Sequence, residues 1–413
     1  MSLKMVSITD VTIGMVLGRP VKSGPDAVLI QAGVVLNDRL LDLLATRGIQ
    51  HVYVESTEGL TGCDLCDPEF RKRIAMREAR RFGDLAGNKV MQELLEATIE
   101  IKARQPQQWP LPDKAPVAEV EPPQPRDEIH ELAKKIQGLP TLPAIYFQVD
   151  RISRDQMASA ADVAQVVSSD PVFAASLLRV ANSALYSGKE EVSTVTRAVN
   201  LLGHKAIRDL CLITSVLDII SLGNDDSRPV NHFWKHAVGV GSLAHVIGER
   251  VAGLPPEELF LSGLLHDIGQ LFWLRYFPDD LARVIAFAEN HSVTVLAAER
   301  KLLKTTHTRL GKLIAHHWNL PRSYVEVIAY HHDLSVTSGR SLACLVVNVA
   351  DVMAHALELA GPECARVPGM NPSVWSSLGM DLDDIGRVLE DALLAFEENK
   401  KNFALFTEEV LST

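Results

Sequence analysis

An adjacent histidine and aspartate, His266 and Asp267, stand in the apolar run Leu264–Gly269. Imidazole nitrogen and carboxylate oxygen together suit a divalent transition ion better than magnesium or calcium. Such an ion would favour metal-assisted attack on a phosphoester. On a helix the two side chains point about 100° apart, so any further ligands must come from other helices.

Other predicted helices carry residues that could complete a metal site. His232 and His236 lie one helical turn apart, and Asp351 lies in an apolar stretch where a buried carboxylate needs a partner. A single histidine on an amphipathic helix is more often hydrogen-bonded or solvated than a ligand. The pattern therefore gains meaning only if the fold brings these helices together. Further histidines in this half of the chain are His245, His307, His316, His317, His331 and His332.

Composition limits the class of protein. The 413 residues are 47% hydrophobic, enough for two or three domains with a sizeable core. The formal charge of −11 argues against charge-driven binding to DNA or to an anionic membrane, so we expect neither partner. The 5 cysteines are an odd, sparse set, typical of reduced thiols. With no apolar signal core in the first ten residues, we expect a cytoplasmic location.

The first half of the chain divides into three parts. Residues 1–56 predict a small α+β domain, because short apolar runs alternate with Gly and Pro. Residues 57–104 predict a linking segment with an exposed basic helix over 70–103, preceded by Cys63 and Cys66, which read as two free thiols rather than half a zinc site or a redox pair. Residues 105–127 are proline-rich and predict an extended linker. In the first domain the expected strands are Val6–Val11, Val16–Val21, Val28–Ile30 and His51–Val54, with a helix at Asn37–Thr46.

The second half predicts an all-helical domain over 128–360 and a helical extension over 361–413. Asp170 followed by Pro171 is a typical helix start. The extension could pack on the core or on another subunit, which leaves a homodimer open. The fold class is therefore mainly α, with a small α+β domain first. Among the expected helices are Val195–Leu202, His204–Ile220, Asn231–Val251, Glu257–Trp273, Pro278–Asn290, Ser292–Leu303, Thr306–Trp318, Arg322–His331, Ser341–Leu359 and Leu382–Phe406.

The order of the candidate ligands resembles the HD superfamily of metal-dependent phosphohydrolases, which is all-helical. The resemblance implies metal ligation by His236, His266, Asp267 and Asp351. The HD-GYP branch, whose members hydrolyse cyclic di-GMP at a site of two or three metals, has extra histidines that match His307, His331 and His332. The implied cofactor is one to three divalent transition ions such as Fe, Mn, Zn or Ni.

Further motifs resemble a sister branch, the HDOD domain, whose members are bacterial signalling and regulatory modules. The match covers about 129–359, and residues 6–55 resemble the small domain found ahead of HD-GYP phosphodiesterases. The HDOD-like motifs are Leu139–Pro143 (LPTLP), Leu177–Ala184 (LLRVANSA), Arg197–Gly203 (RAVNLLG) and Trp318–Pro321 (WNLP).

Three positions depart from active HD-GYP proteins. Gln270 stands where a lysine could hold a substrate phosphate, and the residues after His332 lack the Gly-Tyr-Pro signature. His232 stands where some members have a glutamate. Metal binding tolerates these changes better than turnover does.

Two principal interpretations of the function stay open. The first is a regulatory protein that passes a signal to partner proteins, with a structural metal. The second is a working phosphohydrolase, in which two ions activate water and Asp267 bridges them as the catalytic carboxylate. A third reading is a sensor that binds a cyclic dinucleotide or another nucleotide without hydrolysing it. Proteins that share a fold often differ in their chemistry, which favours the regulatory protein.

Overall fold

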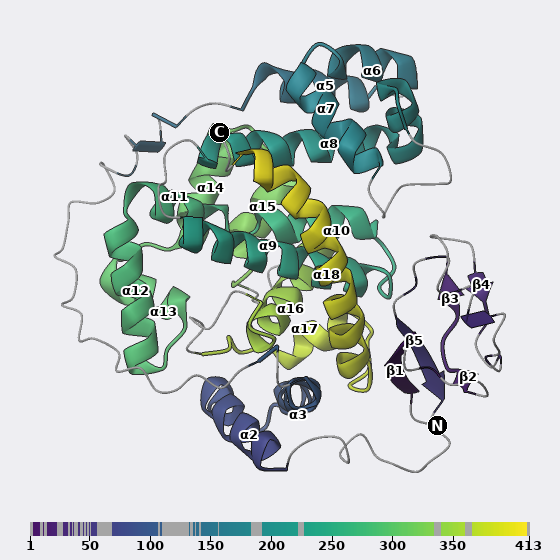
Figure 1. Ribbon diagram of the computed structural model, residues 1–413. Helices are drawn as coiled ribbons and strands as arrows, with labels where there is room; N and C mark the ends of the chain where they lie inside the picture. Colours follow the sequence, from purple (N-terminus) through teal and green to yellow (C-terminus); the bar gives the residue numbers. More distant parts are fainter. Residues whose placement is uncertain are drawn as a thin grey trace. The chain divides into compact units, whose positions relative to one another are not determined.

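The chain forms two compact units in a computed structural model, Met1–Arg71 and Lys72–Thr413. Figure 1 shows a strand-containing unit and a helical one. The structure describes residues 3–55 in short segments, then 68–105, 142–155, 157–182, 192–221, 227–333, 340–359 and 366–410, with single residues between. Cys63, Cys66 and most of the proline-rich stretch lie outside these ranges.

The first unit is a small α+β structure, as predicted. Strand β5 (His51–Glu55) lies between β1 (Leu3–Ser7) and β2 (Val16–Leu17), antiparallel to both, and β3 (Val21–Lys22) pairs with β4 (Val28–Ile30). Leu17, Leu36 and Leu44 are fully buried at its core. Two strand predictions were wrong: the first strand ends at Ser7, and the expected strand over 16–21 is two strands interrupted at residues 18–20.

The second unit is built around helix α9 (Ser227–Gly248), which packs against α10 (Pro256–Leu265), α16 (Leu342–Ala356) and α18 (Asp384–Val410). A Cβ on Gly263 would lie 2.8 Å from the Gly241 Cα, so paired glycines allow α9 and α10 to approach closely. Among the residues described after position 139 there is no strand, which confirms the all-helical prediction. The other helices are α5 (Ala144–Ser153), α6 (Ala160–Val167), α7 (Pro171–Ala181), α8 (Val195–Ser221), α11 (Ile268–Tyr276), α12 (Pro278–His291), α13 (Val295–Leu302), α14 (His307–His317), α15 (Arg322–Tyr330) and α17 (Pro372–Ser377).

Local signals in the sequence account for several helix boundaries. Asp170 Oδ1 accepts a hydrogen bond from the Phe173 amide at 3.0 Å, as expected of a cap before Pro171. Gly203 breaks α8 with φ 81°, a left-handed conformation that glycine adopts at low cost, at the boundary expected there. In the part of the chain that the structure describes, no helix is long and apolar enough to cross a membrane.

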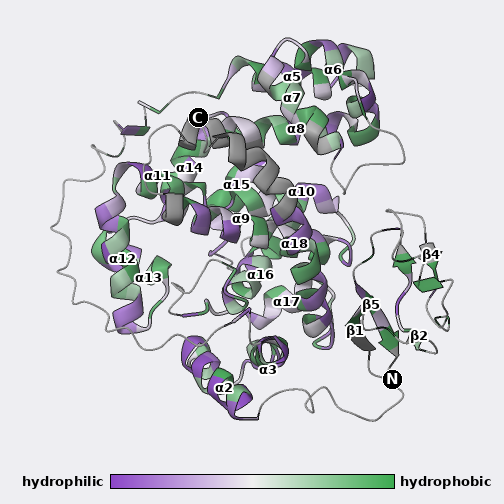
Figure 2. Ribbon diagram, viewed as in Figure 1, coloured by the Kyte–Doolittle hydropathy of each residue, from purple (hydrophilic) through white to green (hydrophobic). Residues whose placement is uncertain are grey.

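The predicted exposed basic helix is two helices with a buried face, α2 (Pro68–Phe82) and α3 (Lys89–Arg104). Ile74, Glu78 and Phe82 of α2 are buried, and α3 contacts α16 and α18. Figure 2 shows hydrophilic and hydrophobic residues side by side on α2, as expected of a helix with one buried face. The prediction of an exposed helix was wrong because the basic residues dominate the sequence pattern, although apolar residues such as Ile74 and Phe82 lie between them.

The single helix expected over 257–273 is broken at the His266-Asp267 pair into α10 and α11. Asp267 has φ −102° and ψ 19°, outside the helical region, and its carbonyl accepts from the Gln270 amide at 2.7 Å. The two side chains are therefore presented at a junction between helices, not along one helix. Gly269, just after the junction, lies against α14: a Cβ there would be 1.9 Å from the His307 carbonyl oxygen.

Replacing Gly269 with alanine is expected to destabilise the second unit by about 1–3 kcal/mol, because backbone atoms of α14 would have to move. Gly386→Ala is the matched control, since nothing lies within 4 Å of a Cβ at that position. In α18 the added methyl should stabilise by roughly 0.5–1 kcal/mol. Urea unfolding of both variants measures the difference, and equal stability would contradict the close approach.

Candidate metal centre

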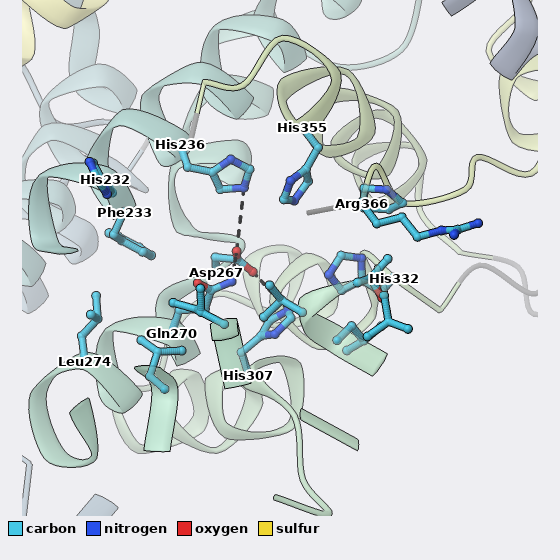
Figure 3. Close-up of a pocket in the computed structure, with 17 residues that line it drawn as sticks. His232, Phe233, His236, Asp267, Gln270, Leu274, His307, His332, His355 and Arg366 are labelled. Carbon is cyan, nitrogen blue, oxygen red and sulfur yellow. Dashed lines mark hydrogen bonds and ion pairs between the residues drawn. The ribbon is translucent and has the colours of Figure 1, made fainter. Parts of the chain in front are cut away.

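The fold brings all seven predicted ligands together with one residue that the sequence analysis missed, His355. They come from five places: His236 on α9, the pair at the α10–α11 junction, His307 at the start of α14, His331 and His332 just after α15, and Asp351 and His355 on α16. Figure 3 shows His236, Asp267, His307, His332 and His355 around a common centre. Potential ligand atoms fall into three overlapping groups, each within 4.8 Å.

The first group surrounds one oxygen of Asp267. Its Oδ1 lies 3.2 Å from His307 Nε2 and 3.4 Å from His331 Nε2. His332 completes this group. Three imidazoles and one carboxylate are a donor set for a divalent transition ion.

The second group lies at the other oxygen of Asp267, and the third gathers at Asp351. Asp267 Oδ2 is 3.4 Å from His266 Nε2 and 3.8 Å from His236 Nε2. Asp351 Oδ1 is 3.2 Å from His236 Nε2 and 3.3 Å from His355 Nε2. Asp267 thus belongs to two groups and His236 to two, the sharing expected where neighbouring ions have a bridging carboxylate.

His355 follows Asp351 by one helical turn, so the two side chains share a face of α16. This i, i+4 spacing was the signal available in the sequence. The other histidines considered lie elsewhere. His245 pairs with Glu249 at 3.7 Å, His317 Nε2 lies 3.3 Å from the Leu139 carbonyl oxygen, and His232 lines the adjoining pocket but belongs to none of the three groups.

Three imidazoles are oriented by acceptors behind them. His266 Nδ1 lies 2.6 Å from the Gly263 carbonyl oxygen and His331 Nδ1 lies 3.0 Å from the Val327 carbonyl oxygen. His307 Nδ1 lies 2.8 Å from Glu299 Oε2. A carbonyl oxygen can only accept, so Nδ1 of His266 and of His331 donates and Nε2 is the ring nitrogen left for the centre. Metal-ligating histidines are held in this way.

The atoms that face the centre fit bound cations better than they fit one another. Among the described residues, they make no hydrogen bond of acceptable geometry although they are buried; they are His236 Nε2, His266 Nε2, His307 Nε2, His331 Nε2, Asp267 Oδ1 and both Asp351 oxygens. Buried polar atoms without partners are costly, and clusters of them indicate an ion or a ligand. The residues therefore fit a divalent metal centre.

Electrostatics within the cluster keep the carboxylates charged. Burial opposes ionisation, but the His266 and His307 imidazoles hold the pKa of Asp267 well below its usual range. Burial lowers the pKa of His236, and it lowers the pKa of His332 much further. Neutral imidazole and ionised carboxylate are the forms that bind metals.

Against the effect of burial, Glu299 and then Asp267 raise the pKa of His307 to about 9. Glu299 is itself fully buried and also accepts from the His307 amide at 3.0 Å. Glu299 was not predicted as a partner, because it lies on α13 while His307 begins α14, and the turn between the two helices brings them together. A bound cation at Nε2 would replace the proton there.

A pocket of about 140 Å³ opens onto the cluster. Its polar side includes five of the candidate ligands, His236, Asp267, His307, His332 and His355, with His232, Gln270 and Arg366. Gln270 Nε2 donates to Asp267 Oδ2 at 2.7 Å, so a neutral amide holds this carboxylate. The apolar side comes from α9, α11, α12, α13 and the residues before α13, and consists of Phe233, Leu274, Leu281, Ile285, Val293, Val295 and Leu296.

Arg366 is the one arginine or lysine among the described lining residues, and it points away from the ligands in Figure 3. Its guanidinium lies against Gly83 and donates to the Ser292 carbonyl oxygen at 3.3 Å. Neither residue 270 nor residue 366 therefore presents a positive charge to the centre. Bound metal ions would supply that charge.

Comparison with known families identifies the core of the helical unit. Residues 139–334 match the family model of the HDOD domain. This part of the chain is an HDOD domain. The HDOD residues include His236, His266, Asp267, His307, His331 and His332, whereas Asp351 and His355 lie on α16, beyond the match.

Similar proteins agree with this fold. An HDOD domain protein of unknown function from Geobacter sulfurreducens is 25% identical, with a TM-score of 0.51 over 68% of this chain and 96% of that one. A candidate phosphohydrolase from Shewanella amazonensis SB2B is 23% identical, with a TM-score of 0.50 over 65% of this chain and 97% of that one, a likeness of fold. An uncharacterized Treponema pallidum protein is 21% identical over 207 residues, 49% of this chain but only 39% of its own length.

Proposed function

We propose that this protein is a bacterial signal-transduction protein whose HDOD domain holds a divalent metal centre needed for its regulatory output. The observation that carries the proposal is the buried cluster of eight side chains around Asp267 and Asp351, with ring nitrogens oriented toward the centre. The ligands would be His236, His266, Asp267 and Asp351 for one ion, joined by His355, and Asp267, His307, His331 and His332 for another. Fe, Mn, Zn and Ni all suit this donor set.

Two residues of the pocket lining, Gln270 and Arg366, support a regulatory role over turnover. Gln270 occupies Asp267 Oδ2 with an amide, and the Arg366 guanidinium faces Gly83 and Ser292. A phosphate ligand would then meet only the bound ions as positive charges. In this proposal the metal-loaded state presents a surface for partner proteins, and the apo state does not.

A phosphodiesterase is the second candidate, favoured by the pocket that reaches the ligands. Bound divalent ions would polarise a phosphoester and lower the pKa of a water molecule. Asp267 would orient that water, and the apolar wall of α12 and α13 could bind the base of a cyclic dinucleotide. A sensor that binds a nucleotide without turnover is the intermediate case.

The test combines metal analysis with an activity assay. Protein purified without chelator should contain divalent metal. With Mn or Fe(II) supplied, it should not hydrolyse cyclic dinucleotides, whether or not it binds them. Hydrolysis that disappears in Asp267→Ala would contradict the regulatory role and establish the phosphodiesterase. Protein that stays free of metal after reconstitution would contradict the metal centre itself.

Metal removal should also change stability. A metal ion that binds only the folded state adds about 2.7 kcal/mol to the free energy of unfolding when the free metal concentration is 100 times its Kd. We therefore expect a chelator to lower the melting temperature by several degrees and added Mn or Fe(II) to restore it. A melting curve that is the same in both conditions would contradict the proposal, and magnesium at the same concentration is the control ion.

A further inference from the structure

Helix α16 supplies Asp351 and His355 from outside the HDOD match, and it packs on α9, α10 and α15. Its last turn ends at Leu357, and Glu358 then takes a left-handed φ of 54°. The last carbonyls of a helix have no partner within the helix. In this chain the His355 carbonyl accepts from the Glu358 amide at 3.2 Å, and side chains before the HDOD match add further donors at this helix end.

Arg81, near the end of α2, is the side chain that bonds two of these carbonyls. Its guanidinium donates to the His355 carbonyl oxygen at 2.6 Å and to the Ala356 carbonyl oxygen at 3.2 Å. Trp109 Nε1 donates to the Leu357 carbonyl oxygen at 3.2 Å. Arg81 is thus bonded to the backbone of a candidate metal ligand.

The same turn of α2 also holds the loop at the pocket rim. The Arg81 carbonyl oxygen accepts from the Val367 amide at 2.9 Å. Arg366 packs on Gly83, where a Cβ would lie 2.3 Å from a guanidinium nitrogen. Residues 81–83 therefore contact both the helix end that carries His355 and the loop that carries Arg366.

A buried ionic cluster fixes the guanidinium in place. Glu78 Oε2 accepts from Arg81 at 2.6 Å, and Lys102 bridges Glu78 and Glu358 at 3.0 and 3.1 Å. Arg77 pairs with both of these glutamates as well. The guanidinium is therefore held by charges from both α2 and α3.

We propose that Arg81 is a positioning residue that sets the place of His355 in the metal centre and so couples α2 to metal binding. The inference rests on the proposed metal centre, and it adds a control point outside the HDOD domain. Outer partners of metal-site residues typically change metal affinity 10–100-fold when they are lost. A planar fork can bond two carbonyls at once, whereas a lysine ammonium offers a single point of charge.

The test compares Arg81→Lys with Arg77→Lys and His355→Ala in the full chain. Both lysine variants keep the charge of the ionic cluster, but Arg77 has its bonds to Glu78 and Glu358 rather than to the ligand's carbonyl. Titration with Mn(II), followed by electron paramagnetic resonance, should show at least tenfold weaker binding of one ion in Arg81→Lys and in His355→Ala, with Arg77→Lys close to the wild type.

Metal-dependent melting separates positioning from simple stability. A merely structural Arg81 would lower the melting temperature with and without Mn(II) equally and leave the Mn(II) affinity unchanged, which would overturn the inference. Wild-type protein that binds no Mn(II) would instead overturn the metal centre. If Arg81→Lys binds Mn(II) as tightly as the wild type does, only the role of Arg81 is overturned.

Discussion

Asp267→Ala should abolish stable metal binding, with affinity for at least one ion falling by more than about 100-fold. The loss should exceed the 10–100-fold effect of removing an outer partner, because this carboxylate belongs to two ligand groups. Its two oxygens face different imidazoles, His307 and His331 on one side and His266 on the other. Metal content of the purified variant, measured by plasma mass spectrometry, checks this prediction.

Asp209→Asn is the matched control for that variant. Asp209 is also a buried carboxylate, but it accepts from Arg208 at 2.9 Å and from the Tyr324 hydroxyl at 3.4 Å, away from the cluster. This variant should lose stability and keep its metal. Equal metal content in Asp267→Ala and the wild type would show that Asp267 is not a ligand.

Glu78→Gln should destabilise the second unit by about 3 kcal/mol or more, since breaking a buried ion pair leaves an uncompensated charge. Lys102 has no exposed surface and lies 3.0 Å from the Glu78 carboxylate. Burial first, and then Arg81, lower the pKa of Lys102 to about 8. The Lys102 ammonium is already poorly solvated, and losing Glu78 would remove a carboxylate that compensates its charge. Urea unfolding near neutral pH measures the loss.

The control is Glu100→Gln, which removes an exposed i, i+4 pair with Arg104 at 3.0 Å. Such pairs contribute about 0–1 kcal/mol, so this variant should resemble the wild type. Burial acts to raise the pKa of Glu78, but Arg81 and Lys102 lower it below its ordinary value of 4.5 overall. Its contribution is therefore present above that value and falls as pH drops through the folded-state pKa. The difference in unfolding free energy between Glu78→Gln and the wild type should become smaller in acid.

Periodicity and capping predicted the helical class well. The boundaries at Asp170 and Gly203 follow from single residues whose conformational preferences are strong. The break between α10 and α11 could not be predicted this way. It depends on Gly269 meeting the backbone of α14, a contact between segments distant in the chain.

The candidate ligands were predictable because residue order matched a known family pattern, whereas their convergence was not. His355 was missed although its spacing from Asp351 places both on one face of α16. Glu299 and Arg81 were missed for a different reason. Glu299 lies on the helix before that of His307, so their contact depends on the turn between α13 and α14, and Arg81 reaches the His355 carbonyl from a segment far away in the chain.

Anomalous X-ray diffraction from crystals of the protein reconstituted with Mn(II) or Fe(II) tests the central claim most directly. Ion peaks are expected on both sides of Asp267, about 2.0–2.6 Å from ligand nitrogen and oxygen atoms. One peak would be bounded by His236, His266 and Asp351, and the other by His307, His331 and His332. Crystals without anomalous density at the cluster, with those imidazoles hydrogen-bonded to the carboxylates instead, would contradict it.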